Sequence, residues 1–354
     1  MLARRKSFDI RSLLKPNVRG LVPYEAREIP CRVKLDANES PYGFEIRPKT
    51  LKDVSTNRYP DPEAKALRRA YAQSIGLKGA DWLLHGNGSD ELIYYLIAAF
   101  GGPVLVPVPT FSMYATIAVG LGERVVRVPL DYNFDLDLPR MLSEMEKKKP
   151  KLIFLSSPNN PTGNRFSEEK ILKIIKASPG MVVVDEAYEP FAKGGSFMEY
   201  LRKYENLFVL RTLSKIGLAG LRTGFLAGRP EAINEVNRVR LPFNLNALSQ
   251  AVAADALGRT RELKKYIKEI VSERERLMKG LADTPGVYPF PSEANFILFR
   301  VKEPGRVYNE LLETGVLVRD LSQALKGCLR VTVGTKKENE FFINAIRKTK
   351  RALQ

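Results

Sequence analysis

Residues 207–215 read LFVLRTLSK, an apolar run typical of a buried strand that leads directly into hydroxyl side chains and a lysine. Two other apolar runs end in a similar way: Asn160 follows residues 152–155, and Asp185 follows residues 181–184. In an open parallel sheet, side chains just beyond the carboxyl ends of the strands converge on one crevice. An amine, a carboxylate and an amide at that crevice suit a protein that holds an aldehyde cofactor through a Schiff base and grips its ring.

Strand and helix patterns alternate around these runs. Residues 167–175 combine a Ser-Glu-Glu start with isoleucines at helical spacing, and the Pro-Gly pair at 179–180 ends that helix. A second helix is expected over residues 196–204, and residues 223–227 are expected to form one more strand. The β-α-β-α-β order predicts a parallel sheet with right-handed crossovers.

The pattern changes after a long amphipathic helix predicted over residues 259–282. Shorter strands follow, over residues 295–300, 315–319 and 328–333. We therefore predict an α/β fold: a large domain with a mostly parallel sheet flanked by helices, plus a smaller α+β domain. The predicted boundaries are 1–45 for an N-terminal arm and small-domain segment, 46–244 for the large cofactor-binding domain, and 245–354 for the small C-terminal domain.

The composition of the 354-residue chain narrows the class of protein. The net charge is +17, but the basic residues are scattered, and the densest runs, 147–149 and 336–337, are short and lack interleaved aromatics. We therefore expect no nucleic-acid partner. No apolar stretch reaches the length of a membrane span, and no apolar segment follows the basic N-terminus, so we expect a cytoplasmic protein without membrane association. One histidine, His85, and two cysteines argue against histidine-assisted hydrolysis and against a metal site.

Residues 86–91, GNGSDE, form a glycine loop whose small side chains would let an anion approach the backbone closely. A helix beginning at Ser89 would direct its free amide groups at a phosphate. The loop matches neither a P-loop nor a dinucleotide fingerprint, and most loops of this kind are plain turns. Phosphate binding and a simple turn therefore both remain open for this segment.

Polar neighbours distinguish the lysine at the end of 207–215 from an ordinary surface lysine. Thr212 and Ser214 offer hydroxyls, and Arg222 offers a bidentate grip on a phosphate. Asp185 follows three valines, and a buried carboxylate there needs a partner, which a protonated pyridine nitrogen would supply. Tyr188, three residues after Asp185, could reach the same pyridine ring. The simpler alternatives are a helix cap for the aspartate and packing for the tyrosine.

Three segments together resemble the pyridoxal-phosphate aminotransferases of fold type I, class II. They are residues 157–163 (SPNNPTG), 185–188 (DEAY) and 212–222 (TLSKIGLAGLR). Five further segments resemble the histidinol-phosphate aminotransferases within that group, and they cover nearly the whole chain in the right order. They are residues 22–24 (VPY), 35–39 (LDANE), 57–60 (NRYP), 109–114 (PTFSMY) and 329–335 (LRVTVGT).

This resemblance implies roles for the residues around the cofactor ring. Lys215 would carry pyridoxal 5′-phosphate as a Schiff base and then move a proton between substrate and cofactor. Asp185 would keep the pyridine nitrogen protonated, so that the ring accepts electrons. Asn160 and Tyr188 would hydrogen-bond the phenolic oxygen, and Phe111 would stack on the ring face. The implied catalytic residues are therefore Lys215, Asp185 and Tyr188.

The resemblance also assigns residues to the cofactor phosphate. These are Gly88, Ser89, Asp90, Thr212, Ser214 and Arg222. Tyr59 would reach the same phosphate from a neighbouring subunit, which implies a homodimer. The chain departs from the families at one place, because Lys215 and Arg222 are seven positions apart where eight are usual. Gly217 could absorb the difference, since glycine tolerates unusual dihedral angles, but the reach of Arg222 to the phosphate is open.

The implied substrates are histidinol phosphate and 2-oxoglutarate, with glutamate as the partner amino acid, in histidine biosynthesis. Arg330 would pair with the substrate α-carboxylate, and Asn160 would lie beside the substrate as well. Arg319 and Tyr24 would bind the distal phosphate of the substrate. An aromatic amino-acid aminotransferase and a phosphothreonine decarboxylase are alternatives on the same fold. A non-catalytic regulator that binds pyridoxal phosphate is the alternative of another class.

Overall fold

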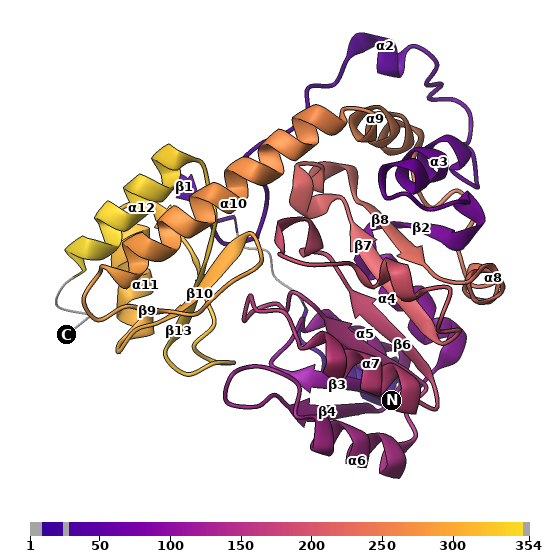
Figure 1. The fold of residues 1–354 in the computed structure, drawn as a ribbon, viewed down its shortest axis with the longest axis horizontal. Helices are drawn as coiled ribbons and strands as arrows, with labels where there is room; N and C mark the ends of the chain where they lie inside the picture. Colours follow the sequence, from indigo (N-terminus) through magenta and orange to yellow (C-terminus); the bar gives the residue numbers. More distant parts are fainter. Residues whose placement is uncertain (1–8, 24–27, 350–354) are drawn as a thin grey trace, which may run out of the picture.

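A computed structural model describes residues 9–23 and 28–349, which fold around a large and a small sheet (Figure 1). Within these residues the large sheet has the strand order β2-β8-β7-β6-β5-β3-β4. Its strands are β2 Leu83–Asn87, β3 Val104–Val108, β4 Val125–Pro129, β5 Leu152–Ser156, β6 Met181–Asp185, β7 Leu207–Thr212 and β8 Thr223–Ala227. The pairs from β4 to β7 are parallel, whereas β8 runs antiparallel to β7 and β2. The predicted mostly parallel sheet is confirmed.

Helices cover both faces of the large sheet, because its central strands are apolar on both sides. In β6, Val183 belongs to the core against α4, α5 and α8, whereas Val182 and Val184 belong to the core against α3, α6 and α7. The helices are α3 Lys65–Ser74, α4 Gly88–Phe100, α5 Met113–Leu121, α6 Leu138–Lys148, α7 Glu168–Ala177 and α8 Pro230–Asn237, with the short turn η2 Ala80–Trp82. This two-sided burial fixes the strand ends that carry the polar residues.

A long helix leads from the large sheet to the small one. In Figure 1, α10 (Thr260–Ala282) runs from α9 (Ala247–Leu257) beside the large sheet to α12 and the small sheet. The small sheet is antiparallel, in the order β12-β13-β10-β9. Its strands are β9 Tyr288–Pro289, β10 Phe296–Arg300, β12 Arg319–Asp320 and β13 Cys328–Thr332, and its helices are α11 Pro304–Glu313 and α12 Lys336–Lys348. The helix predicted over residues 259–282 is thus confirmed.

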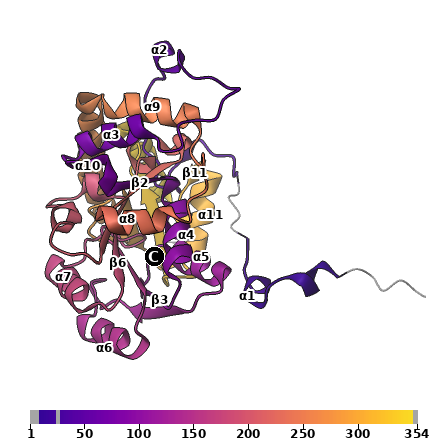
Figure 2. The ribbon, with the colours of Figure 1, turned by 90° about the vertical axis from the view of Figure 1, so that its right-hand side faces the viewer.

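The N-terminal part of the chain contacts both sheets. Its elements are η1 Ile10–Leu13, α1 Pro16–Arg19, β1 Val33–Lys34 and α2 Pro48–Leu51. In Figure 2 the segment with η1 and α1 stands out from the side of the molecule, and Asn17 on α1 donates to the Val119 carbonyl of α5 at 2.7 Å. Strand β1 pairs in parallel with β11 (Val316–Leu317) next to the small sheet. Residues 35–44 therefore run between the two sheets.

Three local expectations differ from the structure. Strand β8 is antiparallel because only the short turns η5 (Ser214–Ile216) and η6 (Ala219–Leu221) connect it to β7, with no crossover helix between them. The helix expected over residues 196–204 is the single turn η4 (Phe197–Tyr200), preceded by the turn η3 (Glu189–Phe191). The strand expected over residues 315–319 is divided between β11 and β12, which belong to different sheets.

The physical reason for the missing helix is a set of polar contacts. The Ser196 hydroxyl donates to Glu186 at 2.7 Å and accepts from Arg211 at 2.9 Å, which ties this segment to the ends of β6 and β7.

The domain boundaries predicted from the sequence stay predictions. Helix α9 falls within the predicted small domain, and in the structure it packs against α3, which covers the large sheet. None of the helices within the described ranges combines the length and hydropathy that a bilayer crossing requires.

Candidate active site

The carboxyl ends of β5, β6 and β7 meet at one edge of the large sheet. Asp185 ends β6 and lies in register with Ser156 of β5 and Leu210 of β7. Asn160 is the fourth residue after the end of β5, and Lys215 is the third after the end of β7. The parallel register therefore brings the three predicted strand-end residues to the same edge, as expected for ligand sites in open sheets.

Asp185 is a buried carboxylate held by two hydrogen bonds. The Tyr114 hydroxyl donates to its Oδ2 at 2.5 Å, and the Ala187 amide donates to its Oδ1 at 3.0 Å. Burial raises the pKa of Asp185 to about 6, although these two hydrogen bonds act in the opposite direction. Both donors are neutral groups, so a positively charged partner at this carboxylate would further stabilise its ionised form.

The residue after Asp185 braces the end of β6. The Glu186 carboxylate accepts from Arg211 Nη2 of β7 at 2.8 Å and from the Phe197 amide at 2.6 Å. The second guanidinium nitrogen of Arg211 pairs with Glu189 on η3. Both members of the Glu186–Arg211 pair are buried, and removing one would leave an uncompensated charge in the core. This ion pair therefore fixes the backbone on which Asp185 and Tyr188 are mounted.

Lys215 and Tyr188 lie beside the segment that crosses between the sheets. The Lys215 ammonium is 5.8 Å from the centre of the Tyr188 ring and donates to the Ala37 carbonyl at 3.5 Å. The Tyr188 hydroxyl accepts from Asn38 Nδ2 at 3.0 Å. Tyr188 is only 4% exposed, so the orientation of its hydroxyl is set by the protein and not by bulk water.

Arg330 joins the small sheet to the loop after β5. Its Nη1 donates to Asn160 Oδ1 at 2.6 Å, and its Nη2 donates to the Asp36 carbonyl at 2.7 Å. The guanidinium also lies over the Phe296 ring at 5.2 Å. Because Oδ1 of Asn160 accepts from the arginine, the amide nitrogen of the same side chain is directed away from it.

The residues assigned to a phosphate gather where β7, η5 and α4 meet. Thr212 Oγ1 donates to Ser214 Oγ at 3.0 Å, and Arg222 donates to Ser214 Oγ at 3.3 Å and to Asp90 at 3.4 Å. Gly88 opens α4 with φ +80°, and a Cβ there would lie 2.6 Å from Arg222 Nη2. Ser89 follows in the first turn, whose amides have no partner within the helix. Hydroxyls, amides and a guanidinium thus converge on one small region.

The seven-position spacing from Lys215 to Arg222 does not keep Arg222 from this region. The connection turns through two left-handed residues, Gly217 at φ +102° and Arg222 at φ +49°. A Cβ on Gly217 would lie 2.6 Å from the Tyr42 carbonyl, so both the conformation and the space require glycine there. The shortened loop closes through these dihedral angles and still directs the guanidinium to Ser214.

Four other predicted residues have different surroundings. The centre of the Phe111 ring lies 5.5 Å from that of Tyr114, in an edge-on contact. Tyr114 in turn contacts Asp185, so Phe111 is connected to Asp185 through Tyr114. Arg319 is exposed on β12 and lies directly opposite Arg330 of β13. Tyr59 is 81% exposed and stacks on Phe243. Tyr24 lies outside the described residues.

The structure brings to the site two residues for which no sequence pattern predicted a role. Tyr114 donates to Asp185, and Asn38 donates to Tyr188. Both lie in segments that carry the resemblance, 109–114 and 35–39, which was the available signal. The contacts themselves depend on how α5 and the crossing segment pack, which no local pattern specifies.

Comparisons with known proteins identify the family. A family model described as aminotransferase class I and II matches residues 20–346. The chain belongs to this family. The aminotransferase is 46% identical over 353 residues to the histidinol-phosphate aminotransferase of Aquifex aeolicus, covering 96% of this chain and 99% of that protein. It is 44% identical over 347 residues to histidinol-phosphate aminotransferase 2 of Nitrosococcus oceani, covering 94% and 96%.

A solved structure shares the fold of this aminotransferase. The histidinol-phosphate aminotransferase of Sinorhizobium meliloti, in complex with pyridoxal 5′-phosphate, superposes with a TM-score of 0.85 at 26% identity, covering 97% of this chain and 99% of that one. The family depends on this cofactor. The donor set here fits it, because a buried carboxylate, a primary amine and a cluster of hydroxyls with a guanidinium lie at one sheet edge.

We predict that Asp185 makes the cofactor-free protein less stable as the pH rises. The pKa of Asp185 is about 6 in the folded chain and 3.8 ordinarily, so the stability that its protonated form contributes is complete below about pH 4 and is lost as the pH rises through 6. Thermal unfolding of the apoprotein should be measured from pH 4 to 8. Over this range the free energy of unfolding of Asp185→Asn, relative to that of the wild type, should increase by up to about 3 kcal/mol.

The exposed residue Asp283 provides the matched control, because Asp283→Asn removes a carboxylate from the surface. We expect that variant to follow the wild-type pH profile closely. If Asp185→Asn and wild type also gave parallel profiles, the buried carboxylate would not be the group that titrates in this range.

Proposed function

We propose that this aminotransferase exchanges an amino group between histidinol phosphate and 2-oxoglutarate, in histidine biosynthesis. The relatives of that name at 44% and 46% identity support the assignment. The structural observation that carries it is the register of the small sheet, which sets Arg319 directly opposite Arg330. Directly opposite residues of antiparallel strands project from the same face, so two guanidinium groups share one side of the sheet. We infer a cytoplasmic location from the biosynthetic role.

The two arginines suit the chemistry of the two substrates. Histidinol phosphate carries a phosphate monoester beside its amine-bearing carbon, whereas glutamate carries a carboxylate there. Arg330, already oriented by Asn160 and Asp36, would bind the anionic group of either substrate through its planar fork. The exposed Arg319 would add a second positive charge, which favours the more highly charged phosphate. We propose that this second charge is the source of substrate preference.

The remaining residues would hold and move protons. Bound pyridoxal phosphate supplies an aldehyde for the amine and an electron-withdrawing ring that takes up charge from the substrate Cα. Lys215 Nζ would take the proton that leaves the substrate Cα and pass it to the aldehyde carbon of the cofactor. Asp185 would hold the proton of the ring nitrogen, and Asn160 and Tyr188 would donate to the phenolic oxygen. Phe111, beside Tyr114, would cover the ring face.

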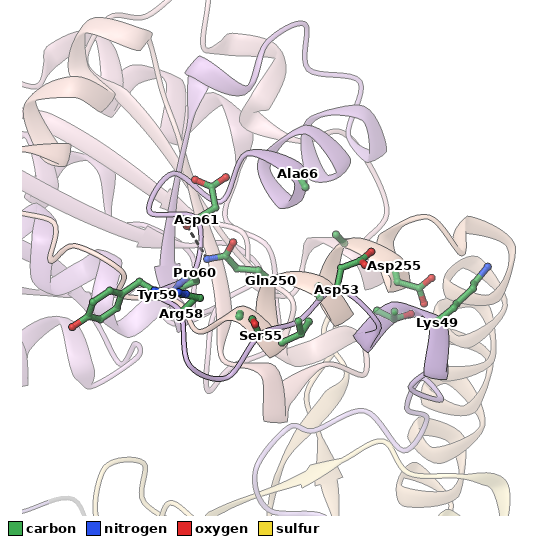
Figure 3. A pocket seen from close by; sticks show the side chains of 15 residues that line it. Lys49, Asp53, Ser55, Arg58, Tyr59, Pro60, Asp61, Ala66, Gln250 and Asp255 are labelled. Carbon is green, nitrogen blue, oxygen red and sulfur yellow. Dashed lines mark hydrogen bonds between the residues drawn. The ribbon is translucent and has the colours of Figure 1, made fainter.

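We further propose that the enzyme acts as a homodimer in which Tyr59 completes the phosphate site of the partner. Segment 49–61 and α9 line a hollow of about 660 Å³, and Figure 3 shows Tyr59 at one end of it and Lys49 at the other. Tyr59 is 81% exposed, and Leu248 on α9 is exposed as well. Large exposed aromatic and apolar side chains around a hollow are typical of an interface between subunits.

The substrate assignment predicts a specific order of activities. The purified holoenzyme should be yellow and should turn over histidinol phosphate with a kcat/KM at least about tenfold above that for phenylalanine, and it should release no carbon dioxide from phosphothreonine. Lys215→Ala should lose both the visible absorbance and turnover, whereas Lys147→Ala on the outer face of α6 should keep both. Faster turnover of phenylalanine than of histidinol phosphate would overturn the substrate assignment.

The arginine pair predicts two different kinetic outcomes. Arg330→Ala should lower kcat/KM about 30-fold or more for both glutamate and histidinol phosphate, because one charge-assisted site serves both half-reactions. Arg319→Ala should lower the value for histidinol phosphate about tenfold more than that for glutamate. Arg347→Ala on the exposed face of α12 removes the same charge as a control. Equal effects of Arg319→Ala on both substrates would exclude it from phosphate recognition.

The shared site predicts rescue between two inactive variants. In a mixture of Lys215→Ala and Tyr59→Ala chains, each hybrid dimer would contain one intact site, so random exchange should restore about a quarter of wild-type activity at limiting cofactor. Each variant alone should stay near background under the same conditions. Activity of the mixture no higher than the mean of its parents would show that Tyr59 serves its own subunit or neither.

A further inference from the structure

Asn38 forms four hydrogen bonds at the point where the crossing segment meets both sheets. Its Nδ2 donates to the Tyr188 hydroxyl at 3.0 Å, and its Oδ1 accepts from the Thr332 hydroxyl at 3.3 Å. Its backbone amide donates to Thr332 Oγ1 at 2.9 Å, and its carbonyl accepts from Asn295 at 3.0 Å. The residue is 1% exposed and has φ +55°, a region that asparagine tolerates better than most residues. Its side chain is therefore fixed in place.

The direction of the bond to Tyr188 has a consequence for the hydroxyl proton. A phenol has one proton to donate, and Asn38 Nδ2 occupies an acceptor site on its oxygen. The opposite amide orientation would present Oδ1 to the tyrosine and would draw that proton toward Asn38. In the observed orientation, Asn38 does not take up the hydroxyl proton, which is free to point to another acceptor.

We propose that Asn38 is a positioning residue: it accepts no proton from Tyr188 and so keeps that hydroxyl available as a donor to the phenolic oxygen of the cofactor. The inference rests on the proposed function for the role of Tyr188. Asn160 is oriented in the same sense, because Arg330 occupies its Oδ1 and leaves its amide nitrogen to donate. Both donors to the phenolic oxygen are thus set from the small sheet and the segment attached to it.

The experiment measures the pH midpoint of the visible absorbance change of the resting holoenzyme, without substrate. Asn38→Asp is nearly isosteric and retains the left-handed conformation, but its carboxylate can only accept and would take the Tyr188 proton. Asn38→Gly deletes the side chain and also tolerates φ +55°. A donor at the phenolic oxygen stabilises its charged form, so Asn38→Asp should raise the midpoint by about one pH unit, as Tyr188→Phe should.

The double variant separates this role from the added charge. In a Tyr188→Phe background, Asn38→Asp should shift the midpoint by less than about a third of its shift in the wild type, because the hydroxyl it acts through is gone. Thr332→Val removes the hydroxyl that donates to Asn38 Oδ1 and so frees the side-chain amide to turn; it should shift the midpoint in the same direction as Asn38→Asp, but by less.

Two outcomes would overturn the proposal. An equal shift in both backgrounds would show that Asn38→Asp acts by charge alone, and an unchanged midpoint in Asn38→Asp would show that the contact has no effect on the hydroxyl. Because the measurement needs no substrate, an enzyme that prefers another amino acid would refute the proposed function and leave this test intact. Apoprotein melting temperatures identify any variant whose fold is damaged, and Asn38→Asp remains informative if Asn38→Gly is one of them.

Discussion

The structure depends on a carboxylate that is buried at the end of a β-strand. Three valines place Asp185 in the core, where burial raises its pKa to about 6 and where its hydrogen-bond donors, Tyr114 and the Ala187 amide, are both neutral. Such a group is costly until a cation neutralises it, and under the proposed function the protonated ring nitrogen of the cofactor would be that cation. The buried Glu186–Arg211 pair next to it holds the end of the strand in place, so the Asp185 carboxylate has a defined position.

A second constraint follows from the way the two sheets meet. Residues 36–38 contact three site residues in succession: the Asp36 carbonyl accepts from Arg330, the Ala37 carbonyl accepts from Lys215, and Asn38 donates to Tyr188. This crossing segment begins at β1, which pairs with β11 beside the small sheet. A shift of the small sheet would therefore disturb the contacts of Arg330, Lys215 and Tyr188 together.

Sequence patterns predicted the parts of this structure that depend on burial along the chain. The valines of β6 and the run before Lys215 are apolar on both faces, which a sheet covered by helices on both sides accommodates. The patterns failed where one tertiary contact decides the outcome. Ser196 is hydrogen-bonded to Glu186 and Arg211 and caps only the short turn η4, and β8 reverses because its connection is too short for a crossover. Tyr114 and Asn38 could not be assigned roles for the same reason.

The loop between Lys215 and Arg222 shows how far a local rule can be used. The loop from Lys215 to Arg222 is one residue shorter than usual, which alone would change where the guanidinium lies. However, the length of a loop limits the positions of its ends only through the dihedral angles that its residues can adopt. Gly217 at φ +102° and Arg222 at φ +49° recover the missing reach, and the Tyr42 carbonyl fills the space that a side chain on residue 217 would need. The residues assigned to the cofactor phosphate therefore converge despite the shorter loop, because the position of Arg222 is set by packing against Gly88 and Ser214 and not by residue count.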